Sequence, residues 1–247
     1  MDSSKFQFQF IHLNSIDSTN IYALELLRQK KSKEGTVVST DFQEIGKGQR
    51  GELWESDRGK NLQFSVLIAP EVSVGNQFSL TQLVAVSLNE WLDTLAVEGV
   101  QIKWPNDILV RGRKIAGVLI ENSIQGNEIS HSVIGIGLNV NQNVFSTFSR
   151  PATSLSIELD GLFDCKKLLN QFLRVFKTNY LKFKPGQINL QQRYLGTLYG
   201  FGTPQRYKDC EGEFTGVILG VLPSGKLQIN KKGKLKNYDL KDLKFLD

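Results

Sequence analysis

The sequence predicts an α+β protein in which a mixed-sheet domain is followed by a small β-barrel. Strand-like and helix-like segments are interspersed over residues 1–198, whereas residues 199–247 show only short strand-like segments separated by turns. The 247 residues, 40% of them hydrophobic, are enough for a substantial buried core. We therefore predict two domains, 1–198 and 199–247.

Side-chain periodicity predicts the first elements. Phenylalanines alternate with polar residues over 6–10, which predicts a half-buried strand. Asp17–Asn20 precedes apolar residues at helical spacing and predicts a capped helix. Thr36–Thr40 and Gln63–Ile68 have the composition of strands. Between them, the polar segment Gln43–Lys60 contains four glycines and predicts a loop.

Two longer helices and the remaining strands follow from the same rules. Ser79–Gln82 has the form of a capping box and predicts the start of a helix. The expected buried face of that helix is Val84, Leu88, Trp91 and Leu95. Asp164 predicts the cap of a second helix, which runs to about Tyr180. Further strands are expected at Val100–Trp104, Ile108–Val110, Ile115–Ile120, Val133–Leu138, Gly216–Val221, Lys226–Ile229 and Leu235–Tyr238.

Charge and cysteine content narrow the function classes. A net charge of +5 and a pI of about 9.1 fit nucleic-acid binding and binding of a small anion equally well. Cys165 and Cys210, with two histidines, are too few for a disulfide framework or a zinc cluster. No apolar run reaches the roughly 18 residues of a membrane span, and residues 1–10 do not resemble an export signal. We expect a cytoplasmic protein that binds no membrane.

The first segment with candidate chemistry is Gly46–Gly51. Its glycines let backbone amides approach a ligand, and Lys47 and Arg50 add positive charge. This composition fits a phosphate-binding loop, but alone it fits a flexible basic surface loop better. Trp54, just downstream, favours the phosphate-binding interpretation, because an aromatic ring can cover a bound base.

Three further segments lie at predicted strands. Lys103–Asp107 reads Lys-Trp-Pro-Asn-Asp, and its Asn106 and Asp107 oxygens suit magnesium beside a phosphate, although an ordinary turn explains them equally well. Lys114–Gly117 begins with a lysine, and a lysine at the mouth of a hairpin is usually solvated. Like Gly135–Asn139, it carries glycine within a strand, which indicates a ligand close to the backbone or crowding in the core.

In this order, the segments resemble the biotin–protein ligase family. Its glycine-rich loop ending in tryptophan is similar to Gly46–Trp54, its Lys-Trp-Pro-Asn-Asp motif is unbroken at Lys103–Asp107, and Asp17–Asn20, Lys114–Gly117 and Gly135–Asn139 match further family segments. The resemblance covers essentially the whole chain, the C-terminal barrel included. Because the first matching segment stands close to the start of the sequence, we expect the monofunctional type without an N-terminal DNA-binding domain.

The resemblance implies a two-step reaction with biotin, ATP and magnesium. The carboxylate of biotin attacks the α-phosphorus of ATP, and a lysine of a biotin carboxyl carrier domain then attacks the resulting biotinyl-adenylate. Such catalysis requires positioning and charge stabilisation rather than a covalent enzyme intermediate. The implied catalytic residues are Lys114, Asp107 and Arg50, with Asp107 as the magnesium ligand. The implied binding residues for biotin and ATP are Ser18, Thr19, Asn20, Gln43, Gly46, Lys47, Gly48, Gln49, Trp54, Lys103, Asn106, Gly117, Gly137 and Asn139.

One departure and two alternatives stand beside this hypothesis. Where the family usually has Gly-Arg-Gly-Arg, residues 46–49 read Gly-Lys-Gly-Gln, so phosphate contacts at Lys47 and Gln49 are less well supported than at Arg50.

A lipoate ligase or lipoyl/octanoyl transferase is disfavoured by the unbroken motif at Lys103–Asp107. A non-catalytic nucleic-acid-binding protein is disfavoured because only Tyr238 accompanies the lysines of residues 231–236. A homodimer is one assembly that the sequence allows without determining the number of copies.

Overall fold

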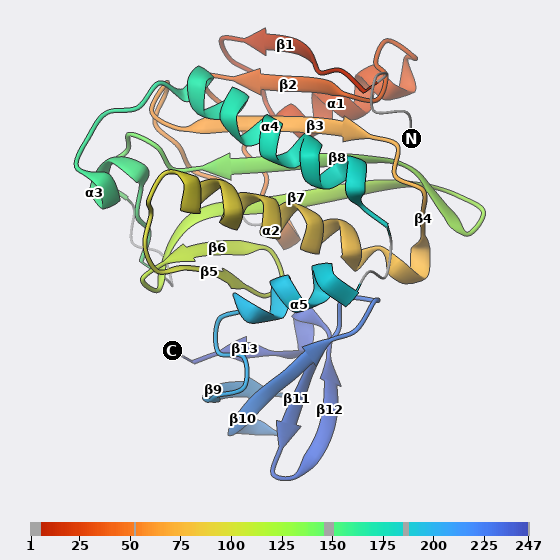
Figure 1. Ribbon diagram of the computed structural model, residues 1–247, viewed down its shortest axis with the longest axis vertical. Coiled ribbons are helices and arrows are strands. Elements are labelled where there is room, and N and C mark those ends of the chain that lie inside the picture. Colours follow the sequence, from red (N-terminus) through yellow and green to blue (C-terminus); the bar gives the residue numbers. More distant parts are fainter. Residues whose placement is uncertain (1–5, 52, 146–150, 185–187, 247) are drawn as a thin grey trace.

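The computed structural model describes residues 6–51, 53–145, 151–184 and 188–246, with the side chains of Arg50 and Ile188 outside this description. Two β-sheets organise the molecule, a large one surrounded by helices and a small one near the C-terminus (Figure 1). Among the described residues, the helices fall short of the length and apolar character that would let one cross a membrane.

The large sheet is mixed, as predicted. Its main path runs β1-β2-β3-β8-β7-β6-β5, and β4 pairs with β8. The β1–β2 pair is parallel, while every other described pair is antiparallel. The strands are β1 Gln9–Leu13, β2 Thr36–Thr40, β3 Leu62–Ile68, β4 Val72–Ser73, β5 Val100–Lys103, β6 Asp107–Val110, β7 Arg113–Gln125 and β8 Glu128–Leu138.

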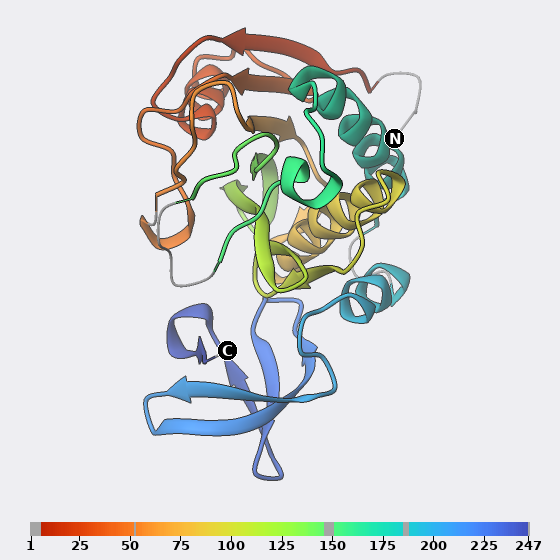
Figure 2. The ribbon, with the colours of Figure 1, turned by 90° about the vertical axis from the view of Figure 1, so that its left-hand side faces the viewer.

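Helices cover both faces of this sheet (Figure 2). Helix α1, Thr19–Arg28, lies on one face, and α2, Phe78–Thr94, and α4, Cys165–Lys182, lie on the other. The core between α2, α4 and the sheet contains stacked and edge-on aromatic rings, among them Trp91 and Phe172 with centroids 5.8 Å apart. The shorter helices are α3 Leu155–Leu159 and α5 Ile188–Gly196.

The C-terminal region is the predicted all-β unit. Its antiparallel strands follow the order β12-β11-β10-β9-β13. They are β9 Pro204–Asp209, β10 Gly212–Val221, β11 Leu227–Lys231, β12 Lys234–Tyr238 and β13 Lys244–Phe245. The turn between β10 and β11 contacts the part of the chain that forms the large sheet, where Trp104 Nε1 donates to the Gly225 carbonyl at 2.8 Å. The α+β class is confirmed, whereas the division between residues 198 and 199 stays a prediction.

Two predictions of the residue at which an element begins were wrong. Helix α2 begins at Phe78 with Gln77 at its N-cap, so Ser79 is already inside the helix and its hydroxyl donates to the Asn76 carbonyl at 2.7 Å. A 3-10 turn over Val74–Asn76 leads directly into the helix, which makes a capping box unnecessary. The first strand begins at Gln9 rather than at residue 6. By contrast, the Asp164 cap is confirmed, since its carboxylate accepts from two backbone amides.

Candidate active site

A cavity of about 890 Å³ opens where β7 and β8 face the loop of residues 43–55 and the end of the chain. It gathers residues that are far apart in the sequence. Nearly all the predicted site residues line it: Ser18, Thr19, Asn20, Gln43, Lys47, Gly48, Gln49, Trp54, Lys103, Asn106, Asp107, Lys114, Gly117, Gly137 and Asn139.

Two predicted residues are not among the described lining. Gly46 is a buried residue of the loop, and its carbonyl accepts from the Trp54 amide at 2.8 Å. A Cβ atom at position 46 would lie 2.4 Å from the Trp54 carbonyl oxygen, so glycine allows this loop to close. The side chain of Arg50 lies outside the described residues. Its predicted catalytic role therefore stays a prediction.

The start of α1 supplies a polar wall. The Thr19 amide donates to Gln43 Oε1 at 2.8 Å, and Gln43 Nε2 donates to Gln63 Oε1 at 3.0 Å. Ser18 occupies the N-cap, but its side chain makes no capping hydrogen bond. The hydroxyl therefore remains available to a ligand, and the predicted capping function of this side chain is not what the structure shows. This wall offers both donors and acceptors, as a ligand with mixed polar groups requires.

Lys114 and Asp107 form an ion pair at the opposite side of the cavity. Lys114 Nζ lies 2.7 Å from Asp107 Oδ1, and both side chains are partly exposed. The backbone of Lys114 is held by residues 151–153, since its amide donates to the Pro151 carbonyl and its carbonyl accepts from the Thr153 amide. Asn139 Nδ2 also donates to the Thr153 carbonyl, at 2.9 Å. These bonds fix the lysine on a rigid strand.

Trp54 packs against glycines of the central strands. Gly117 and Gly137 are cross-strand partners in β7 and β8. A Cβ atom at Gly137 would lie 2.4 Å from the Trp54 indole, and one at Gly117 would lie 3.4 Å from it. The buried indole Nε1 has no partner among the described residues. These two glycines therefore leave room for the indole ring to lie against the strands.

Sequence reasoning missed the contribution of the chain end. Lys244 and Phe245 of β13 line the cavity, and Lys103 Nζ lies 4.9 Å from the centroid of the Phe245 ring. No motif in residues 240–246 indicates this position, which depends on how the small sheet docks. The other missed lining residues include Leu53, Glu55, Phe145, Ala152, Leu240, Leu243 and Leu246.

The charge of the lining suits a polyphosphate. Among the described lining residues, the four lysines Lys47, Lys103, Lys114 and Lys244 outnumber the two acids Glu55 and Asp107. The described residues contain no group of three or more histidine, cysteine or acidic side chains that could hold a metal. Magnesium that accompanies a nucleotide needs only one or two carboxylates besides the phosphates, so Asp107 with Asn106 beside it is compatible with that ion.

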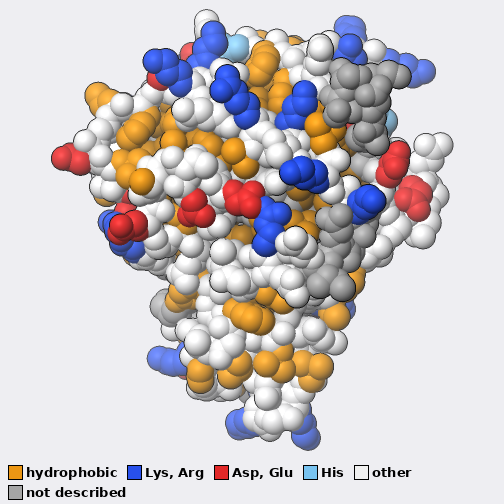
Figure 3. All heavy atoms as spheres, in the orientation of Figure 1, with side chains coloured by type: hydrophobic (Ala, Val, Ile, Leu, Met, Phe, Trp, Pro, Cys, Tyr) orange, Lys and Arg blue, Asp and Glu red, His pale blue; other side chains and the backbone are white. Residues whose placement is uncertain are grey.

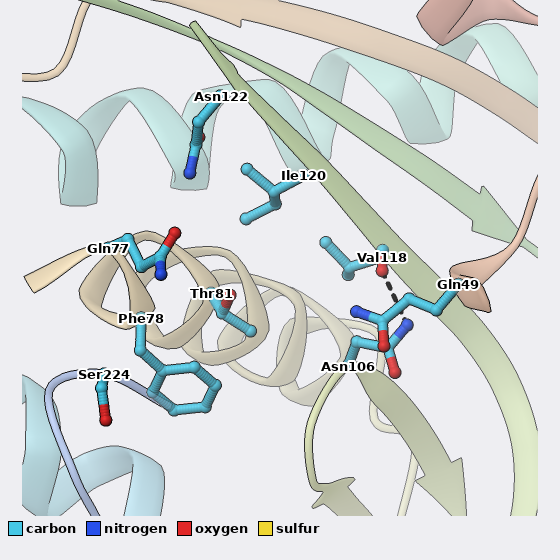
Figure 4. Close-up of a pocket in the computed structure, with 9 residues that line it drawn as sticks. All are labelled: Gln49, Gln77, Phe78, Thr81, Asn106, Val118, Ile120, Asn122 and Ser224. Atoms are coloured by element: carbon cyan, nitrogen blue, oxygen red, sulfur yellow. Dashed lines mark hydrogen bonds between the residues drawn. The ribbon is translucent and has the colours of Figure 1, made fainter. Parts of the chain in front are cut away.

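A smaller cavity of about 140 Å³ adjoins the first (Figure 4). Gln49, Asn106 and Val118 line both cavities. Figure 4 shows the Gln49 side chain directed toward Asn106, whose Nδ2 donates to the Val118 carbonyl at 2.8 Å. Gln49 Oε1 is buried without a partner among the described residues. Gln49 thus lies at the boundary between the two spaces.

Two lysines of the basic C-terminal segment, Lys231 and Lys236, are held in ion pairs. Lys231 Nζ lies 2.7 Å from both Asp209 and Glu211, and Lys236 Nζ lies 2.7 Å from Glu211. On the face shown in Figure 3, positive and negative side chains are interspersed over the upper part, and a few positive side chains stand apart from one another in the lower part. Because ion pairing reduces the attraction of these lysines for phosphates, this geometry disfavours the nucleic-acid-binding alternative.

The chain is similar to known proteins in both sequence and fold. The sequence model of the biotin/lipoate A/B protein ligase family matches residues 13–139. The bifunctional ligase/repressor BirA of Bacillus subtilis is 30% identical over 95% of this chain and 73% of its own length. The biotin–[acetyl-CoA-carboxylase] ligase of Paracoccus denitrificans is 26% identical, over 85% of this chain and 90% of its own. The structure of the Aquifex aeolicus biotin protein ligase with biotin and ATP has a TM-score of 0.79 at 27% identity, and the match covers 96% of this chain and 99% of that one.

Proposed function

The chain belongs to the biotin/lipoate A/B protein ligase family, and we propose that it is an ATP-dependent biotin–protein ligase. It activates biotin as biotinyl-AMP and transfers the biotinyl group to a lysine of a biotin carboxyl carrier domain of a carboxylase. The main support is that the polar wall and the four lysines Lys47, Lys103, Lys114 and Lys244 line one cavity, in a fold similar to that of a ligase whose structure holds biotin and ATP.

The polar wall and the lysines have different roles in the first step. Ser18, Thr19 and Gln43 offer hydrogen-bonding partners to the ureido ring of biotin. At the opposite side, Lys114 neutralises charge between the attacking carboxylate and the α-phosphate. Magnesium held through Asp107 would add positive charge at the phosphates. Trp54 and Asn139, which line the same cavity, contact the nucleotide in this proposal.

In the second step the acceptor amine attacks the carbonyl carbon of the mixed anhydride, and AMP leaves. The protein must keep water from this anhydride until the acceptor arrives. The lining that residues 47–49, 53–55 and 243–246 contribute suits that requirement, since it encloses part of the cavity. A homodimer and a cytoplasmic location stay predictions from the sequence.

Mass spectrometry of an acceptor tests this proposal. The full-length protein is incubated with biotin, ATP, magnesium and a biotin carboxyl carrier domain, and a parallel reaction contains lipoate with a lipoyl domain. We expect a mass gain of one biotinyl group in the first reaction alone. An acceptor whose target lysine is replaced by arginine serves as the control. Modification only in the lipoate reaction would overturn the assignment.

A further inference from the structure

Glu121 on β7 contacts the polar wall from behind, although it lies outside the described lining of the cavity. Its Oε2 accepts from Asn20 Nδ2 at 2.8 Å, and the Leu119 carbonyl accepts from the same Nδ2 at 3.3 Å. A carboxylate and a peptide carbonyl are acceptors only. The Asn20 amide must therefore direct its NH₂ group toward them and its oxygen the opposite way.

The opposite side of Asn20 is occupied by a buried hydroxyl. Ser65 Oγ lies 2.6 Å from Asn20 Oδ1 and 2.8 Å from Thr19 Oγ1, and Ser65 is fully buried. A serine hydroxyl has a single proton, and Asn20 Oδ1 can only accept it. The proton of Thr19 then goes to Ser65 Oγ or to Gln43 Oε1, which lies 3.1 Å away and can only accept, so in either case Thr19 Oγ1 keeps a lone pair for the cavity that it lines.

Steric fit holds this arrangement in place. A Cβ atom at Gly135 would lie 2.3 Å from Asn20 Oδ1, so the amide occupies space that only a glycine on β8 leaves open. Asn20 is 3% exposed. In such a confined, low-dielectric place a hydrogen bond to a charged acceptor is stronger than one to a neutral acceptor. Glu121 is the charged member of this group.

We propose that Glu121 is a positioning residue for the biotin ring. Its charge fixes the direction of the hydrogen bonds through Asn20, Ser65 and Thr19, so that Thr19 presents an acceptor oxygen to a ring N–H. This role rests on the proposed function, because it assumes that biotin occupies the polar wall. Glu121 touches neither the nucleotide side nor the Lys114–Asp107 pair in the described contacts, so its effect is confined to biotin.

A purely structural role for Glu121 predicts a different outcome. Helix α1 is already held against the sheet by a separate apolar cluster of Ala23, Val38, Leu67 and Val133. Loss of one hydrogen bond leaves this cluster intact, so the folded protein should persist without the carboxylate. A structural role would lower thermal stability without separating the affinities for the two substrates.

Calorimetric binding of biotin alone and of ATP alone to the full-length chain tests the proposal. Glu121→Gln keeps the shape and removes the charge, Glu121→Met removes the acceptor, and Glu128→Gln is a matched control because this exposed glutamate belongs to the same β7–β8 hairpin. We expect the Kd for biotin to rise about tenfold for Glu121→Gln and further for Glu121→Met. The Kd for ATP should stay within twofold in every variant.

The outcomes separate the two hypotheses. If wild-type protein binds biotin and Glu121→Gln and Glu121→Met bind it equally well, the positioning role is wrong while the proposed function stands. An equal loss of biotin and ATP affinity would also overturn the positioning role. If wild-type protein does not bind biotin, the proposed function fails and the positioning role fails with it.

A charge exchange adds a second test. Asn20→Asp alone puts two carboxylates face to face, whereas Asn20→Asp combined with Glu121→Gln lets the new amide donate to the new carboxylate. The carboxylate at position 20 still accepts from Ser65, so the hydrogen-bond direction is restored. We expect the double variant to bind biotin more tightly than Asn20→Asp alone. Equal or weaker binding would contradict the proposal.

Discussion

Lys114 Nζ lies 2.7 Å from Asp107 Oδ1, although strand register pairs Lys114 with Leu109 and Asp107 with Gly117. The lysine side chain crosses this offset by lying over Gly117, where a Cβ atom would come within 3.4 Å of its Cε. Glycine at position 117 thus lets the lysine extend along the strand toward the carboxylate. The pair brings together the predicted cation of the reaction and the predicted magnesium ligand.

Lys114→Ala should nearly abolish adenylate formation while the fold persists. The lysine is partly exposed and on a well-paired strand, so its removal should change the free energy of unfolding by less than about 0.5 kcal/mol. Loss of one preorganised electrostatic contact commonly lowers kcat by roughly 100- to 1,000-fold. Pyrophosphate release measures the effect, with Lys234→Ala on the exposed face of β12 as the control. Wild-type rates from a folded Lys114→Ala protein would remove Lys114 from the mechanism.

Asp107→Asn should raise the magnesium concentration needed for adenylate formation more than it weakens biotin binding. Oxygen ligands with full negative charge hold hard cations best, whereas biotin does not need that charge. The substitution also removes the charged partner of Lys114. The measurement is the rate of adenylate formation across a magnesium titration, together with the Kd for biotin. An unchanged magnesium requirement, or a larger loss for biotin than for ATP, would contradict the assignment.

Gln49→Arg should slow the escape of biotinyl-adenylate. Gln49 lies at the edge of the main cavity and lacks a partner for its oxygen among the described residues. A hydrogen bond to a charged group contributes about 1.5–3 kcal/mol, compared with about 0.5–1.5 kcal/mol for a neutral one. The expected gain of about 1.4 kcal/mol corresponds to a roughly tenfold slower dissociation rate. Equal rates for preformed adenylate would show that position 49 faces the smaller cavity and not the phosphate.

Trp104→Phe should destabilise the protein by about 1–3 kcal/mol beyond the effect of ring size, because the Gly225 carbonyl loses its indole donor. Trp91→Phe is the matched control. Trp91 is equally buried, but its Nε1 has no partner among the described residues, so its substitution removes ring volume without a hydrogen bond. Denaturant unfolding compares the two variants. Equal losses would mean that the contact between Trp104 and the β10–β11 turn contributes no net stability.

Alkylation should distinguish the two cysteines. Burial, assisted by the charge of Asp164, raises the pKa of Cys165 to about 11, whereas Cys210 is exposed in the turn between β9 and β10. At pH 8 only about one Cys165 thiol in a thousand is ionised, and that fraction rises as the pH approaches 11. Iodoacetamide at pH 8 should therefore modify Cys210 first, as read by peptide mass spectrometry. Equal modification of both cysteines would contradict this expectation.

Local patterns in the sequence predicted the elements that depend on local interactions. Strand β2, Thr36–Thr40, has the predicted bounds, and the Asp164 cap forms as expected. The start of α2 could not be predicted in the same way, because the chain enters it through a 3-10 turn that carries no capping signature. The packing of Trp54 on Gly117 and Gly137 depends on strand register, which the separate motifs do not encode.

The site was predictable to the extent that its residues belong to motifs. Ser18, Lys114 and Asn139 all reach the cavity from motif segments. Lys244 and Phe245 reach it because the small sheet docks through a turn near Gly225, a contact between residues more than a hundred positions apart. Such placement is a property of tertiary packing, and hydrophobic periodicity gives no information about it.

The position of Trp54 also gives the molecule an internal optical reporter. Of its three tryptophans, Trp91 and Trp104 are buried, at 1% and 3% exposure, whereas Trp54 is partly exposed and lies against glycines at the cavity wall. A ligand that enters the cavity changes the polarity around Trp54 and around Trp104, which also lines the cavity, and leaves Trp91 in constant surroundings. Intrinsic fluorescence can therefore follow occupancy of the cavity in unlabelled protein, and Trp54→Phe separates the signal of Trp54 from that of Trp104.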